Sequence, residues 1–230
     1  MQIFEYTNKG AREYNQDFTL HRSISNGGHI FIVADGMGGY AAGDIAAKSV
    51  SESIFEYVDE HIKETSPEIL LHEAVIFANS ELEFRRFSYG GVQMGTVIVV
   101  MLLIGSNAYV TWLGDSRLYH YRGNKLCFLT TDHSMLNKLK KTRVLTPEDI
   151  DRFSAIVTQC IMGDDNLGNV PVYNFTLETG DVVFMCSDGI HKVIEPRSLP
   201  KDDDKLMEFL NKNVEKFDDH LRINGIGGIN

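Results

Sequence analysis

Apolar and polar positions along the chain follow two periods, and the two-residue period of a strand is the commoner. Eight runs alternate every second residue or are rich in β-branched and aromatic residues, and turn residues bound each run. The predicted strands cover residues 17–21, 29–35, 96–104, 108–113, 117–121, 125–130, 172–177 and 181–187. The connections at 105–107 and 122–124 are too short for a crossover helix, so we expect an antiparallel meander there.

Three segments have the 3.6-residue period of an amphipathic helix. They cover residues 41–61, 68–87 and 205–217. In the second segment, Leu71 and Val75 share one face. Thr65 and Glu68 have the spacing of a capping box before it. Residues 142–154 are polar and weakly periodic, and we expect a helical or irregular insertion there.

The order of these elements predicts the fold class. Hairpin-connected strands with helices before and after them indicate an α+β fold in which helices cover antiparallel sheets, and they argue against a doubly wound parallel sheet. The chain has 230 residues and shows no repeat, linker or low-complexity tract, so we expect one domain over residues 1–230. The longest apolar run, 97–104, is far short of a membrane span.

Charge and cysteine content narrow the classes of partner and compartment. Thirty-two acidic and 22 basic residues give a net charge of −10, which argues against a nonspecific electrostatic hold on nucleic acid or on an anionic membrane. Cys127, Cys160 and Cys186 are odd in number and lack CxxC spacing, so neither a disulfide framework nor a zinc knuckle is expected. The N-terminus has no export signal pattern, and we expect a cytoplasmic monomer.

Candidate chemistry gathers where predicted strands end in aspartate beside glycine. Asp35 precedes Gly36, Asp115 follows Gly114, and Asp188 precedes a glycine, each after an apolar run. Each pair alone is typical of a turn. Three at one sheet edge would repel one another unless cations neutralised them, and oxygen ligands favour magnesium or manganese.

Other phosphate and hydrolase motifs fail on their residues. Gly38 and Gly43 have the outer spacing of a P-loop, but Asp44 and Ile45 occupy the positions that need lysine and serine or threonine. The chain has no GxSxG, HExxH or CxxC motif.

Six strings stand in the order in which a known family carries them. They are GAREYNQD at 10–17, ADGMGG at 34–39, GT at 95–96, GDSRLY at 114–119, TTDHS at 130–134 and CSDGI at 186–190. With them the chain resembles the protein phosphatase 2C family of metal-dependent phosphatases, bacterial type. The resemblance implies two antiparallel β-sheets stacked face to face and flanked by helices, an αββα sandwich. It also implies hydrolysis of phosphoserine and phosphothreonine in proteins, those of a cognate kinase among them.

The resemblance also implies roles for seven residues. Asp35 and Asp188 resemble carboxylates that bind or bridge metals, and Gly36 resembles a backbone-carbonyl ligand. Asp218 resembles the late aspartate that completes the second metal site, and Asp115 resembles a ligand of a third metal. Arg12 matches the arginine that clamps the phosphate, and Asp17 matches an acidic residue that holds metal-bound water. Two Mn²⁺ or Mg²⁺ ions about 4 Å apart would then activate a water for in-line attack. An arginine grips two phosphate oxygens at once, which a lysine cannot do.

Three departures from the family pattern qualify this expectation. Lys192 replaces an aspartate that helps to hold the third metal, so we expect two occupied metal positions and a weak or empty third. Met37 stands where animal relatives carry a histidine that acts as a general acid. The sequence around Asp218 also differs from the family's usual Asp-Asn-x-Thr. A degenerate member that binds phosphoproteins as a regulator without turnover, and a phosphatase for small phosphoesters, remain alternatives.

Overall fold

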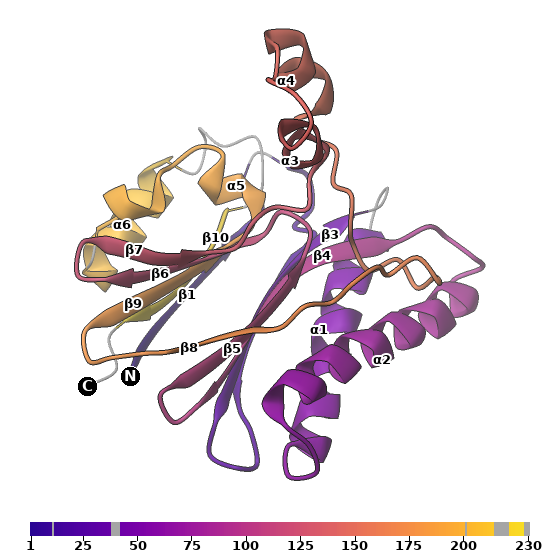
Figure 1. The fold of residues 1–230 in the computed structure, drawn as a ribbon, viewed down its shortest axis with the longest axis horizontal. Helices are drawn as coiled ribbons and strands as arrows, with labels where there is room; N and C mark the ends of the chain where they lie inside the picture. Colours follow the sequence, from indigo (N-terminus) through magenta and orange to yellow (C-terminus); the bar gives the residue numbers. More distant parts are fainter. Residues whose placement is uncertain (11, 38–41, 201, 214–220, 228–230) are drawn as a thin grey trace.

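Two five-stranded antiparallel sheets lie face to face, and helices cover both outer faces (Figure 1). The computed structural model describes residues 1–10, 12–37, 42–200 and 202–213, and the backbone of 221–227. One sheet has the order β1-β10-β9-β6-β7 and the other the order β2-β3-β4-β5-β8. The expected αββα sandwich is confirmed.

All eight predicted strands are present, with ends shifted by at most two residues. The first sheet contains β1 (Gln2–Asn8), β10 (Leu221–Gly227), β9 (Asp181–Cys186), β6 (Arg117–Arg122) and β7 (Lys125–Leu129). The second contains β2 (Asp17–Ser23), β3 (His29–Met37), β4 (Gly95–Ile104), β5 (Asn107–Leu113) and β8 (Tyr173–Thr176). Sequence analysis missed β1, an edge strand that pairs with β10 from the opposite end of the chain.

The predicted meander is correct for its hairpins and wrong as a continuous sheet. β4 pairs with β5, and β6 pairs with β7, across the two short connections. Between β5 and β6, however, the chain leaves one sheet and enters the other. This crossing carries Asp115 to the edge where the two sheets meet.

Helices form the outer layers of the sandwich. α1 (Ala42–His61) and α2 (Pro67–Ser88) cover the sheet that contains β3, and α5 (Asp188–His191), η1 (Pro196–Ser198) and α6 (Asp203–Asn213) lie on the side of the sheet that contains β9 (Figure 1). The predicted capping box at Thr65 is wrong, because Ser66 caps α2 and accepts from the Ile69 amide. None of the helices in the described ranges is long and apolar enough to cross a membrane.

The insertion predicted at 142–154 is a pair of short helices that projects from the sandwich (Figure 1). α4 (Pro147–Phe153) lies within the predicted range, and α3 (Met135–Lys140) precedes it and was missed. A capping box between Thr146 and Asp149 starts α4.

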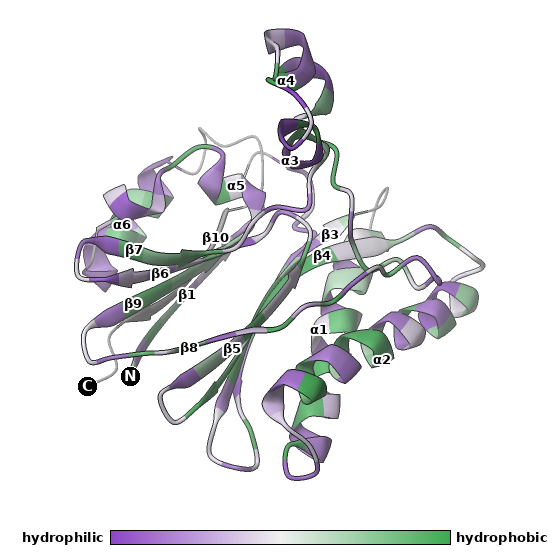
Figure 2. Ribbon diagram, in the orientation of Figure 1, coloured by the Kyte–Doolittle hydropathy of each residue, from purple (hydrophilic) through white to green (hydrophobic). Residues whose placement is uncertain are grey.

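Three apolar clusters hold the layers together, and β4 contributes to two of them. Its alternate residues Ile98 and Val100 pack under α1 and α2, while Val99 and Met101 face the other sheet. A third cluster lies between the outer face of the β9 sheet and α6. Figure 2 shows hydrophobic colour along the strands and mainly hydrophilic colour on the projecting helices. The packed sandwich therefore fixes the strand ends that position the site.

Candidate active site

A cavity of about 250 Å³ lies at the edge where β3 ends, β5 passes to β6 and β9 meets α5. Its walls include Arg12, Asp35, Gly36, Asp115, Asp188 and Lys192. Five of the seven predicted site residues thus line one cavity. Asp17 lies beside it, directly opposite Asp35 in the β2–β3 register. Asp218 lies outside the described residues.

Asp17 is held in place by a residue that sequence analysis did not assign. The hydroxyl of Ser187 donates to Oδ2 of Asp17 at 2.9 Å, and both residues are buried. Ser187 directly precedes Asp188 in the CSDGI motif, and that position was the sequence signal that could have identified it. The bond ties the start of β2 to the end of β9, so it joins the two sheets at the site.

The carboxylates of the cavity repel one another. Desolvation, and then the charges of Asp17, Asp188 and Asp115, hold the pKa of Asp35 well above its usual value. Burial and the charge of Asp188 raise the pKa of Asp115 to about 6, and Lys192 opposes that rise. A site that gathers negative charge in this way favours the binding of cations.

Lys192 occupies part of the space between two of these carboxylates. Its ammonium lies 2.5 Å from Oδ2 of Asp188 and 3.9 Å from Oδ2 of Asp115. The i,i+4 spacing across α5 brings Lys192 back over Asp188. The positive charge therefore stands where the family pattern has a carboxylate.

Gly36 is packed so closely that no side chain fits there. A β-carbon on Gly36 would lie 2.1 Å from the carbonyl oxygen of Gly43 and 2.4 Å from that of Gln16. The amide of Gly36 donates to the same Gln16 oxygen at 3.1 Å. The Thr96 hydroxyl donates to the Asp35 carbonyl at 2.9 Å. The strand end that carries Asp35 is fixed from three sides.

His191 is a further residue that sequence analysis missed. Its Nε2 donates to the Asp115 carbonyl at 2.8 Å. Burial and the nearby Arg117 lower the pKa of His191 to about 4, so the ring is neutral at pH 7. The bond holds the β5–β6 crossing against α5. The sequence alone offered no partner for this histidine.

The residues present suit divalent cations in their donor chemistry. Carboxylate and carbonyl oxygens are the ligands that magnesium and manganese prefer. Within the described ranges, no three Asp, Glu, His or Cys side chains already form a complete ion-binding group. Asp218, the further ligand that the family resemblance implies, lies outside the described residues.

Comparison with known proteins identifies the family. The profile of the family described as protein phosphatase 2C matches residues 7–222. The chain belongs to the protein phosphatase 2C family. Protein phosphatase PhpP of Streptococcus pneumoniae is 33% identical over 202 residues, which cover 84% of this chain and 80% of the relative. Serine/threonine phosphatase stp of Listeria welshimeri is 27% identical over 233 residues, covering 90% of this chain and 86% of the relative.

Solved phosphatases share the fold. The S. agalactiae serine/threonine phosphatase has a TM-score of 0.83, 26% identity and coverage of 99% of both chains. The catalytic domain of PstP, solved in complex with two manganese ions, has a TM-score of 0.81 and 20% identity, covering 100% of this chain and 98% of that chain. The expected family and activity class are confirmed. This protein phosphatase 2C member is a metal-dependent protein serine/threonine phosphatase, and its substrates are phosphorylated proteins.

Proposed function

We propose that the cavity at the strand ends is the phosphatase centre, with paired Mn²⁺ or Mg²⁺ ions held by Asp35, Gly36, Asp188 and Asp218. The observation that supports this most directly is the raised pKa of Asp35, which desolvation, Asp17, Asp188 and Asp115 together produce. Carboxylates that destabilise one another in the absence of metal gain most from cations. When bound, the two cations supply a water activated for attack on phosphorus and screen the phosphate charge.

The remaining residues of the cavity orient the reactants. Arg12 is exposed at the cavity and is placed to grip two oxygens of the incoming phosphate. Asp17, fixed by Ser187, accepts a hydrogen bond from the attacking water and holds its direction. Met37 lines the cavity and cannot donate a proton, so the proton for the leaving hydroxyl comes from water or from another group.

We propose that residues 1–230 act as one phosphatase domain, monomeric and cytoplasmic, on proteins that a cognate kinase phosphorylates. The unpaired cysteines Cys127, Cys160 and Cys186 support a reducing compartment. Asp115 contributes to a third, weaker cation position in this proposal, because Lys192 stands in for a ligand.

Hydrolysis of a phosphothreonine peptide tests the function directly. We expect phosphate release with manganese or magnesium and none with a chelator, because the water needs the cations. The peptide's binding should be measured in parallel by fluorescence anisotropy. Binding without release would favour the regulator without turnover. Release from para-nitrophenyl phosphate but not from the peptide would favour a phosphatase for small phosphoesters.

Lys192→Asp is expected to add a third, weaker Mn²⁺-binding event to the two of the wild type. The change replaces an ammonium with a ligand between Asp188 and Asp115, and divalent affinity rises with the number of ligand charges. Isothermal titration calorimetry counts the Mn²⁺-binding events. Lys63→Asp, at an exposed position that does not line the cavity, changes the net charge by the same amount and is the control. Three tight events in the wild type would refute the displacement of a ligand by Lys192.

A further inference from the structure

A second, larger cleft adjoins the catalytic cavity. Its volume is about 580 Å³, and its walls come from the end of β5, from β7, from β8 and from the start of the projecting helices. The two spaces are separated by one stretch of backbone, because Val157 lines the catalytic cavity and Thr158 lines the cleft. The Thr158 amide donates to the His133 carbonyl at 2.8 Å, which fixes this stretch against the sandwich. The cavity and the cleft therefore adjoin the same stretch of backbone at Val157 and Thr158.

The floor of the cleft is aromatic and partly open to solvent. The rings of Trp112 and Tyr173 have centroids 5.2 Å apart, and those of Phe128 and Tyr173 are 6.2 Å apart. Tyr173 is 47% exposed, whereas Trp112 is only 5% exposed and donates its indole N–H to the Thr131 carbonyl at 2.9 Å. Such a floor offers flat apolar contact area to a bound chain.

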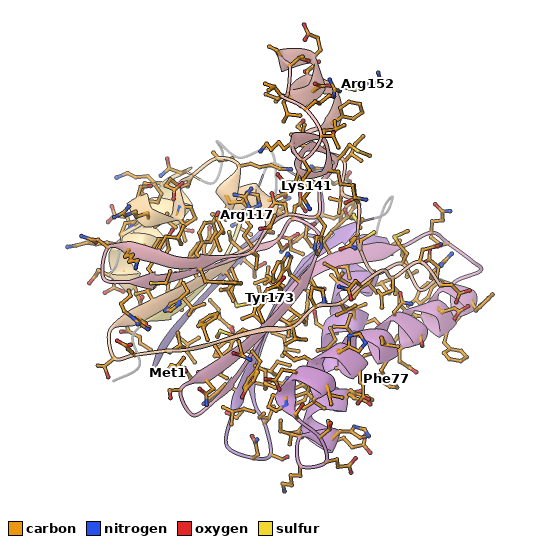
Figure 3. The ribbon with its side chains drawn as sticks, in the orientation of Figure 1. Met1, Phe77, Arg117, Lys141, Arg152 and Tyr173 are labelled. Carbon is orange, nitrogen blue, oxygen red and sulfur yellow. The ribbon has the colours of Figure 1, made fainter. Side chains whose placement is uncertain are left out.

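The rim of the cleft is positive although the whole chain carries a net charge of −10. Asp132 is neutralised by two bonds of 2.7 Å from Arg117. Lys138 and Lys141 also line the cleft, are exposed, and have no ion-pair partner among the described residues. Figure 3 shows Lys141 at the base of the projecting helices, with Tyr173 on the sandwich below it in this view.

The electrostatics of His133 agree with this charge distribution. Burial is the main cause that lowers the pKa of His133; the charge of Asp132 opposes that shift, and the charges of Lys138 and Lys141 lower the pKa further. The ring is therefore neutral at pH 7 and stacks on Trp112 at 5.9 Å. The two lysines remain as the uncompensated charges of the cleft.

We propose that this cleft docks an acidic segment that flanks the phosphorylated residue in the protein substrates of this enzyme. The inference rests on the proposed function, because it places the phosphorylated residue in the adjoining cavity. Acidic side chains would meet Lys138 and Lys141, and the backbone and apolar atoms between them would pack on Tyr173. The net negative charge of the rest of the protein repels such segments elsewhere, so the cleft selects where they bind.

Binding can be measured without catalysis, because Trp112 is the only tryptophan of the chain and forms part of the floor. An acidic peptide without phosphate should change the fluorescence of Trp112 in a saturable way, and a lysine-rich peptide of equal length should not. Lys138→Glu/Lys141→Glu should weaken acidic-peptide binding about tenfold or more, and higher salt should weaken wild-type binding. Lys48→Glu/Lys63→Glu changes net charge equally on exposed positions outside the cleft and should leave binding unchanged.

Equal affinities of the two double variants for the acidic peptide, or equal binding of the acidic and lysine-rich peptides by wild type, would overturn the docking site.

Kinetics add a second readout. Lys138→Glu/Lys141→Glu should lower kcat/KM for a phosphothreonine peptide with acidic flanks about tenfold and leave para-nitrophenyl phosphate hydrolysis unchanged. If wild type hydrolyses the peptide and the variant keeps the same preference for the acidic phosphopeptide over para-nitrophenyl phosphate, the docking inference fails while the proposed function stands. If the acidic peptide changes Trp112 fluorescence but no phosphopeptide is hydrolysed, the proposed function fails, and with it the assignment of the bound segment to a substrate, although the cleft still binds acidic chains.

Discussion

Asp35→Asn should lower kcat on the order of 10²–10³-fold, the scale seen when one electrostatic contact to the reacting group is lost. In the proposed centre Asp35 supplies a full ligand charge, and the amide that replaces it does not. The measurement is phosphate release from a phosphothreonine peptide at saturating manganese. Asp151→Asn, an exposed aspartate on α4, is the matched control and should keep its activity. Near wild-type turnover in Asp35→Asn would exclude Asp35 as a metal ligand.

The same change should stabilise the metal-free protein at neutral pH. The folded-state pKa values of Asp35 and Asp115 lie above the ordinary 3.8. The folded state therefore binds more protons than the unfolded state, and stability falls as pH rises from about 4 through the folded-state values, about 6 for Asp115. Asp35→Asn removes the part of this loss of stability that Asp35 contributes.

Thermal melts in chelator at pH 5 and pH 7.5 measure this effect. The variant should melt higher than wild type at pH 7.5 and differ less at pH 5, on a scale of roughly 2–4 °C per kcal/mol for a domain of this size. A lower melting temperature at pH 7.5 would mean that the hydrogen bond between the Asp35 and Asp17 side chains outweighs the repulsion. Added manganese should reverse the order, because wild type then gains more from the cations.

Gly36→Ala should abolish turnover and destabilise the fold by about 1–3 kcal/mol or more, the usual range for overpacking. The new β-carbon would stand 2.1 Å from a backbone oxygen of Gly43, which begins α1 with Ala42, so either β3 or α1 must move. Such a shift displaces Asp35 and its carbonyl together.

Gly105→Ala is the matched control for this effect. Gly105 lies in the β4–β5 hairpin at φ +59°, and a β-carbon there meets nothing within 4 Å. That change should cost about 1 kcal/mol of backbone strain and leave kcat intact. Calorimetric melts measure the loss of stability in Gly36→Ala and Gly105→Ala, and activity assays measure the turnover of each variant. A Gly36→Ala variant with full activity would show that the site tolerates movement of the strand end.

The sequence by itself determined the strands, most helices and the chemical character of the site. β4 was predictable because residues 97–104 form an unbroken apolar run, as expected for a strand buried on both faces, and that signal is local. The aspartates at strand ends were recognisable for the same reason, since Asp35 and Asp188 stand where an apolar run stops. Those signals predicted an acidic site for divalent cations, but they carried no distances.

Only the tertiary structure decided which of these residues meet. Asp115 joins the others because the chain changes sheets between β5 and β6, and local patterns contain no information about which sheet a strand joins. Ser187 and Asp17 form their hydrogen bond across 170 residues. Such contacts depend on strand order and register, which are set by packing over the whole core. The sequence placed Lys192 where the family has a third-metal ligand, but only the structure shows that its ammonium turns in toward Asp188 and Asp115 instead of out to solvent.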